Sequence, residues 1–369
     1  MDIPEFLQYF PTVYAVRDRY EIIFLTKEAG AGEVVVNGIR YTDNVCGVVR
    51  SGRQIHRVSI RADVLNSAAG YTVVFRSIPE RKPYFPQTAS TMSAGFCFRP
   101  VPESEDIHCY ILADTHSHVT APTKAGSYFD EQLNLLILCG DIGNTATDEK
   151  SVLTVARLSS NLAKGEIPVL YLRGNHDTRG AFAEYLPDYV GTDHGRTYYP
   201  FRLGRLWGVV LDAGEDKPDT NKEYGDTADF APFRDAQTEM LKELIDRAAT
   251  EYEAKDVQVR LALCHIPFPV VETPFAQVYD RWTEQLNRIG IHLFLGGHNH
   301  YLRFLPAGES IGGSNLHNFP ASICARIDRS DLDTYAGTAM IIRKNEILLR
   351  YTDIHHQVLE EHTVPIEIK

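Results

Sequence analysis

The stretch LLILCGDIGN, residues 135–144, indicates the fold class of this chain. Five apolar residues run without interruption and then give way to Gly140 and Asp141, which is typical of a strand buried on both faces. Comparable apolar runs occur at ILADTH (111–116), VLYLRGNHD (169–177), WGVVLD (207–212), LALCH (261–265) and HLFLGGHNH (292–300). These runs predict buried strands.

Helical patterns lie between the predicted strands. Residues 150–164 place Val152, Val155, Leu158 and Leu162 on one face and end at Gly165. Residues 234–248 and 275–289 show the same spacing of apolar side chains. Strands that alternate with helices indicate a layered α/β domain. Residues 338–364 return to strand character, and we expect them to complete a second sheet.

The first hundred residues have a different pattern. Short β-branched and aromatic runs are separated by glycines, with no helical period, at residues 20–26, 33–36, 56–60 and 71–78. This spacing predicts a small β-sandwich. Prolines and acidic residues around position 103 mark a boundary, so we predict two domains, residues 1–103 and residues 104–369.

The composition narrows the possible partners. The net charge of −12 argues against a nucleic-acid or anionic-membrane binder, because both partners favour clustered Lys and Arg. An anionic substrate is still compatible, since bound divalent cations reverse the local field. The chain shows no signal peptide, no run of ~20 apolar residues and no paired cysteine motif. We therefore expect free thiols and a cytoplasmic protein.

Polar residues follow the predicted strands, where folding alone does not require them. They comprise two carboxylates, five imidazoles and one carboxamide: Asp114, His116, Asp141, Asn175, His176, His265, His298 and His300. Each motif alone is common in turns and helix caps. Ligand sites of open α/β sheets form beyond the carboxyl ends of strands, so their joint occurrence predicts a metal site. The two histidines of GHNH can each bind one of two neighbouring metal ions.

The order of these motifs resembles the calcineurin-like metallophosphoesterase superfamily, whose blocks run DxH, GDxxD, GNH(D/E), H and GHxH. Here the blocks read DTH, GDIGN, GNHD, CH and GHNH, over about residues 107–300. The resemblance implies a four-layer sandwich of two β-sheets flanked by helices. The preceding β-sandwich, of fibronectin type III-like character, is reminiscent of purple acid phosphatases.

The resemblance also implies a ligand set for two divalent ions, with Mn, Fe or Zn as the leading candidates. One ion would be held by Asp114, His116, Asp141 and His300. The other would be held by Asp141, Asn175, His265 and His298. Two such ions ~3.5–4 Å apart need a bridging carboxylate, and they acidify a bridging water so that hydroxide can attack phosphorus. His176 resembles the family's acid, which stabilises the transition state or protonates the leaving oxygen.

The sequence departs from the family pattern at Asn144, where the block GDxxD has its second Asp. An amide can orient the His176 imidazole but cannot offset its positive charge. We therefore expect a lower pKa for His176 or recruitment of Asp177 as the neighbouring acid. Purple acid phosphatases carry Tyr at the position of Asn144 and Gly at that of His116, so no purple charge-transfer colour is expected.

Two further residues are candidates for substrate binding. Arg179 in GNHDTRG is placed to clamp a phosphate oxygen, and the alternative is an arginine on a helix surface. His118 in DTHSH is placed to reach the pocket, and the alternative is a solvated histidine.

The sequence thus predicts a dinuclear phosphohydrolase acting on a phosphomonoester or a small phosphodiester, with neither nucleic acid nor membrane as partner. The alternative is a catalytically silent binding protein with a structural metal site. The natural substrate, the metal, the role of the N-terminal domain and the oligomeric state stay open.

Overall fold

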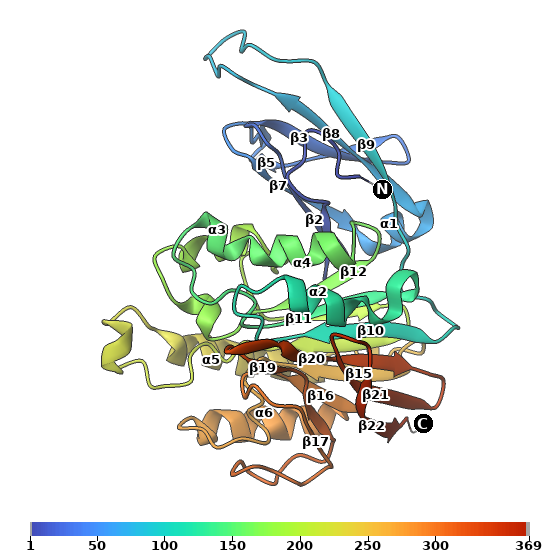
Figure 1. The fold of residues 1–369 in the computed structure, drawn as a ribbon, viewed down its shortest axis with the longest axis vertical. Helices are drawn as coiled ribbons and strands as arrows, with labels where there is room; N and C mark the ends of the chain where they lie inside the picture. The colour runs from blue at the N-terminus through green and yellow to red at the C-terminus, as the bar shows by residue number, and fades with distance from the viewer. Residues whose placement is uncertain (1, 367–369) are drawn as a thin grey trace.

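Two β-sheets with helices on their outer faces form the centre of the computed structural model, which describes residues 2–366 (Figure 1). The large sheet has ten strands. Its order is β22 (Val358–Pro365), β21 (Glu346–Asp353), β20 (Asp331–Ile342), β10 (Ile107–Leu112), β11 (Leu135–Cys139), β12 (Pro168–Leu172), β1 (Thr12–Val16), β2 (Arg19–Leu25) and β7 (Ile55–Arg61), while β19 (Arg326–Asp328) pairs with β20. The second sheet has the order β13 (Tyr199–Leu203), β14 (Leu206–Val210), β15 (Val259–Leu263), β16 (Leu293–Gly296), β18 (Ala321–Ile323) and β17 (Arg303–Leu305).

The alternation of side chains along β15 shows how the two sheets pack. Leu261 and Leu263 belong to the core shared with the large sheet, whereas Ala262 belongs to a second core. In that second core the sheet packs against α5 (Phe230–Asp246) and α6 (Ala276–Ile289). Successive residues of a strand point to opposite faces, so strands covered on both faces must be apolar throughout. Burial on both faces therefore explains why the apolar runs of the sequence are uninterrupted.

Helices α2 (Thr120–Gly126), α3 (Glu149–Val152) and α4 (Thr154–Leu162) cover the outer face of the large sheet (Figure 1). The predicted fold class is therefore confirmed: two sheets lie between two layers of helices. The sequence did not predict α2 or the short α1 (Ala62–Ala68). Helix α2 buries only small residues, so it lacks the spaced large side chains that reveal a helix in a sequence.

The N-terminal segment forms a β-sandwich, but one of its sheets is shared. β4 (Ile39–Thr42), β3 (Gly30–Val36), β8 (Gly70–Ser77) and β9 (Met92–Cys97) make a four-stranded sheet, which packs on β2 and β7 in one common core. β1 pairs in parallel with β12, which joins β2 and β7 to the large sheet. Strand pairing thus continues across the predicted division at residue 103, and this division stays a prediction.

The expectation for residues 338–364 is wrong in one respect. β20, β21 and β22 extend the large sheet, because β20 pairs antiparallel with β10. Short connections make these strands a meander, and such a meander can add to either sheet. Its partner is decided by long-range packing, which local patterns do not report.

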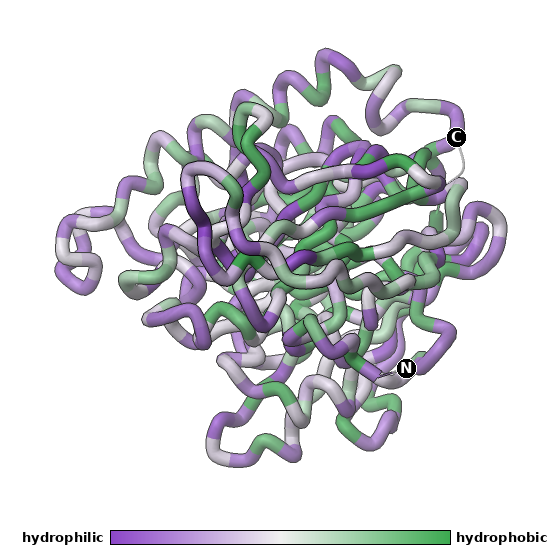
Figure 2. The backbone as a smooth tube through the Cα atoms, turned by 90° about the horizontal axis from the view of Figure 1, so that it is seen from above, coloured by the Kyte–Doolittle hydropathy of each residue, from purple (hydrophilic) through white to green (hydrophobic). Residues whose placement is uncertain are grey.

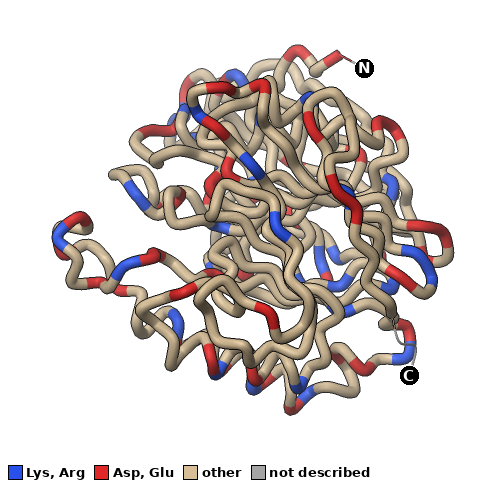
Figure 3. The backbone as a smooth tube through the Cα atoms, turned by 60° about the horizontal axis from the view of Figure 1, so that its bottom comes forward, with Lys and Arg blue, Asp and Glu red and all other residues tan. Residues whose placement is uncertain are grey.

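Figure 2 shows that the central strands are mostly hydrophobic and that the loops are mostly hydrophilic. Acidic and basic residues are interspersed over the face seen in Figure 3. Among residues 2–366, no helix has the length and apolar character needed to cross a membrane. All six cysteines are free, and Cys109, Cys139, Cys264 and Cys324 are buried. The cytoplasmic location stays a prediction.

Candidate metal centre

The predicted ligands converge at one edge of the sandwich, where strands of both sheets end. β10, β11 and β12 of the large sheet lead to Asp114 and His116, to Asp141, and to Asn175. β15 and β16 of the second sheet lead to His265 and to the pair His298 and His300. Three groups of side chains could each hold an ion: Asp114, His116 and His300; His116, Asp141 and His176; and Asp141, His265 and His298. Because the groups share members, they form one cluster.

The first group centres on Asp114, which is fully buried. The His300 Nε2 atom lies 3.4 Å from Asp114 Oδ1 and 2.9 Å from His116 Nε2. The backbone N–H of His298 donates to both oxygens of Asp114, at 3.1 and 3.0 Å. One carboxylate and two imidazoles thus place their donor atoms within 4.8 Å of one another, and this set could hold a metal ion.

The second group centres on Asp141 and His265. The His265 Nε2 atom lies 3.2 Å from Asp141 Oδ2, while its Nδ1 atom lies 2.7 Å from the Cys139 carbonyl oxygen. A carbonyl only accepts, so Nδ1 carries the proton and Nε2 is left to bind a metal. Asn175 Oδ1 lies 3.0 Å from His298 Nδ1. Asp141 belongs to two of the candidate groups, which is the position expected of a bridging carboxylate.

The electrostatics of the cluster suit cations. Burial lowers the pKa of His116 to about 3 and also lowers that of His298, so both rings offer a lone pair at neutral pH. Burial has the same effect on His265, but the charge and hydrogen bond of Asp141 outweigh it and raise the pKa of His265 to about 10. Two buried carboxylates thus draw a positive charge into the centre, and a divalent ion supplies such a charge. The mixed N and O donors suit Mn, Fe or Zn.

The backbone is strained at the same residues. Five ligands have positive φ: Asp114 (54°), His116 (44°), Asp141 (51°), His298 (73°) and His300 (60°). Non-glycine residues seldom adopt this conformation, and such strain gathers at functional sites. Gly174 has no Cβ, and one placed there would collide with the Asp141 carboxylate. Glycine in the GNHD motif therefore lets the two strand ends approach closely.

His176 is oriented by a backbone group. Its Nδ1 atom lies 2.8 Å from the carbonyl oxygen of Asn144. The backbone N–H of His176 donates to Asp141 Oδ1 at 2.8 Å. The Asn144 side chain is exposed. The expectation that the Asn144 carboxamide orients the imidazole is thus replaced by an interaction of the main chain, which any residue at position 144 can provide.

Asp177 does not contact the His176 imidazole. Its carboxylate is buried and accepts hydrogen bonds from the N–H groups of Asp141 (3.0 Å), Gly143 (3.1 Å) and Gly174 (3.0 Å), and from the Tyr171 hydroxyl (3.1 Å). The expected recruitment of Asp177 as an acid for His176 is therefore wrong. Its carboxylate instead joins the two segments that carry Asp141 and Asn175.

Replacing Asp177 with alanine is expected to lower the free energy of unfolding by about 3 kcal/mol or more, because it leaves buried donors without an acceptor. Urea denaturation measures this loss. Asp235→Ala, which removes an exposed carboxylate on α5, is the matched control. If Asp177→Ala kept the stability of the wild type and lost only turnover, Asp177 would have a catalytic role after all.

The guanidinium group of Arg179 is paired with a carboxylate of the protein itself. Its Nε and Nη2 atoms each donate to Glu215 at 2.7 Å, and Glu215 is buried. Its Nη1 atom faces His176 Nε2 at 3.4 Å. Glu215 lies in the acidic segment of residues 213–230, so this segment contacts Arg179 beside the predicted ligands. The side chain of His118 shows no polar contact with the metal-ligand cluster among residues 2–366, so its role stays a prediction.

Arg329 is a residue that the sequence did not reveal. It lies between β19 and β20, and its Nη2 atom is 2.8 Å from His116 Nε2. No motif marks the segment RIDRSDLD, because an arginine near a turn is usually solvated. Only the pairing of β20 with β10 brings this turn to the metal centre.

Comparisons with known proteins bear on the family and the fold of this chain. The sequence profile of the calcineurin-like phosphoesterase family matches residues 107–302. A purple acid phosphatase from yellow lupin seeds has a similar structure, with a TM-score of 0.63 and 12% identity over 96% of this chain and 74% of the lupin chain. The structure of PhoD has a TM-score of 0.55 and 9% identity over 99% of this chain and 90% of its own. A search of curated sequences gave no match.

Proposed function

The chain belongs to the calcineurin-like phosphoesterase family, and we propose that it is a dinuclear metal-dependent phosphohydrolase. One observation carries this proposal. Three overlapping groups of His and Asp side chains from both sheets form one cluster, in which Asp141 belongs to two groups and Asn175 contacts His298. In the proposed assignment Asp114, His116, Asp141 and His300 hold one ion, and Asp141, Asn175, His265 and His298 hold the other.

Two divalent ions at these positions would supply Lewis-acid chemistry: activation of water and neutralisation of the phosphoryl oxygens. The chain itself supplies the acid. His176 is held through Nδ1 by the Asn144 carbonyl, and its Nε2 atom, which faces Arg179 Nη1, would carry the proton toward the leaving oxygen. Glu215 pairs with Arg179, whose Nη1 atom faces the imidazole.

The arginine side chains beside the candidate metal centre indicate the charge of the phosphate group that it would bind. Arg179 Nη1 faces His176, and Arg329 faces His116. Glu215 already pairs with Arg179, so Arg329 is the guanidinium group that favours a dianionic phosphate over a monoanionic one. We therefore favour a phosphomonoester, with a small phosphodiester as the second candidate.

Reconstitution with metal tests this function. Chain stripped of metal and reloaded with Mn, Zn, Fe or Mg would be assayed on p-nitrophenyl phosphate and on bis-p-nitrophenyl phosphate. We expect metal-dependent turnover, faster on the monoester. Binding of two ions without turnover of either compound would favour the alternative, a binding protein with a structural metal site.

Replacing Arg329 with glutamine is expected to raise KM for the monoester about tenfold with a smaller effect on kcat, because one charge-assisted contact to the phosphate is lost. The expected effect on the diester is smaller. Steady-state kinetics on both substrates measure the two constants. Arg343→Gln, at the opposite end of β20, is the matched control. An unchanged KM for the monoester would remove Arg329 from the substrate site.

A further inference from the structure

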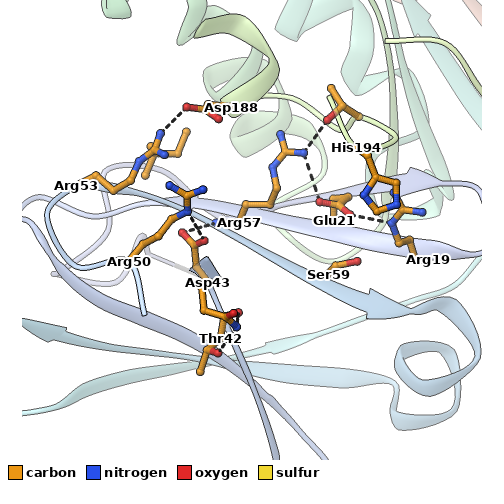
Figure 4. A pocket seen from close by; sticks show the side chains of 13 residues that line it. Arg19, Glu21, Thr42, Asp43, Arg50, Arg53, Arg57, Ser59, Asp188 and His194 are labelled. Carbon is orange, nitrogen blue, oxygen red and sulfur yellow. Dashed lines mark hydrogen bonds and ion pairs between the residues drawn. The ribbon is translucent and has the colours of Figure 1, made fainter. Parts of the chain in front are cut away.

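A second cluster of charged side chains lines a cavity of about 310 Å³ on the face of β2 and β7 (Figure 4). The segment of residues 42–53 forms one wall, and the loop of residues 188–194 forms another. Four arginines line the cavity, and none of its lining residues belongs to the metal-ligand cluster. The cavity is thus a separate feature of the molecule.

Two of the four arginines have a structural role. Arg57 donates to the Thr192 hydroxyl at 2.8 Å and to the carbonyl oxygens of Pro187 and Val190. Arg19 donates to the buried Glu21 at 2.9 Å. Arg19 also donates through Nη2 to Asp193 Oδ1 in the loop at 3.0 Å. The contacts of Arg57 and Arg19 with residues 187–193 fasten the loop onto β2 and β7.

The guanidinium groups of the other two arginines use only some of their N–H donors. Arg50 has one ion pair, between its Nε atom and Asp43 Oδ1 at 3.2 Å. Arg53 has one ion pair, between its Nη2 atom and Asp188 Oδ2 at 2.7 Å. A guanidinium carries five N–H donors, and no other hydrogen bond of these two groups is found among residues 2–366. Figure 4 shows Arg50 paired with Asp43 and Arg53 paired with Asp188, and both arginines line the cavity.

We propose that this cavity binds a small molecule through a phosphate group, with Arg50 and Arg53 as the principal donors. Planar guanidinium groups recognise phosphate oxygens through paired N–H donors. The volume falls at the lower end of the range for small-molecule sites, which leaves space for a phosphate with a small organic body.

The acidic residues of the cavity do not prevent this binding. Glu21 is paired with Arg19 and Arg57, and Asp43 is paired with Arg50. Asp188 is the exposed acid, with 51% of its side chain accessible, and exposed ion pairs contribute little. A phosphate dianion therefore takes the place of Asp188 on Arg53 and leaves the buried pairs intact.

Isothermal titration of the full-length chain in EDTA tests the site, because hydrolysis at the metal centre is then excluded. The probes are inorganic phosphate and ribose 5-phosphate, with ribose as the uncharged comparison. We expect saturable binding of the phosphate-bearing probes at one site. Tighter binding of ribose 5-phosphate than of inorganic phosphate would identify a phosphorylated metabolite, and equal affinity would identify free phosphate.

The double variant Arg50→Gln and Arg53→Gln is expected to bind about tenfold more weakly or worse, because charged donors are lost. Arg61→Gln, an exposed arginine on β7 outside the cavity, is the matched control. Arg329→Gln should also leave this affinity unchanged, which separates the cavity from the metal centre. The same ligands should raise the melting temperature of the wild type but not that of the double variant. Absence of saturable binding, or equal affinity in the double variant, would overturn the proposal.

Discussion

Replacing Asp141 with asparagine is expected to lower metal-dependent turnover by about three orders of magnitude or more, because the carboxylate proposed to bridge the two ions is lost; Asp141 belongs to two of the three candidate groups. The amide has the same shape but no charge to balance two cations. It also removes the partner of the buried His265, whose Nε2 atom lies 3.2 Å from the carboxylate. We expect the variant to bind fewer than two ions.

Metal content by atomic emission and turnover of p-nitrophenyl phosphate measure the two effects. Asp63→Asn makes the same chemical change at an exposed carboxylate on α1 and serves as the control. Far-ultraviolet circular dichroism checks that Asp141→Asn remains folded. If the folded variant kept both ions and wild-type turnover, Asp141 would not be the bridging ligand.

Replacing His176 with alanine is expected to slow hydrolysis of an alkyl phosphate by about 10²- to 10⁴-fold, the range for loss of a general acid. An alkoxide leaving group needs a proton, whereas p-nitrophenolate leaves without one. The effect on p-nitrophenyl phosphate should therefore be much smaller. Both ions should still bind, because His176 is outside the proposed ligand set.

The ratio of the two rates, measured for wild type and His176→Ala, distinguishes the possible roles. His355→Ala, at an exposed position before β22, is the control. Equal losses on both substrates would assign His176 to stabilisation of the transition state rather than to proton transfer. Loss of a bound ion would instead make His176 a ligand, as its place in a group with His116 and Asp141 allows.

Much of the layered architecture and the convergence of the site could be predicted because both have local causes. Strands buried on both faces need uninterrupted apolar runs, and β10, β11, β12, β15 and β16 all match such runs. Polar residues directly after these runs fall at the carboxyl ends of strands by covalent connection alone. The proximity of Asp114, Asp141 and Asn175 follows once their strands are parallel neighbours.

Strand partners could not be predicted in the same way. β1 lies between β12 and β2, and β20 lies beside β10 rather than in the second sheet. An apolar run fits equally well against several others. Its neighbour is decided by the packing of the whole core, and local sequence patterns contain no such information.

The sequence by itself therefore determined the identity of the candidate ligands and the ends of the strands that carry them. Only the tertiary structure decided where neighbouring side chains point. The Asp177 carboxylate binds three backbone N–H groups and the Tyr171 hydroxyl instead of the His176 imidazole. Arg329 reaches His116 from more than two hundred positions away in the chain, because β20 pairs with β10. Side-chain direction and long-range pairing both depend on contacts between distant segments, which form only when the chain folds.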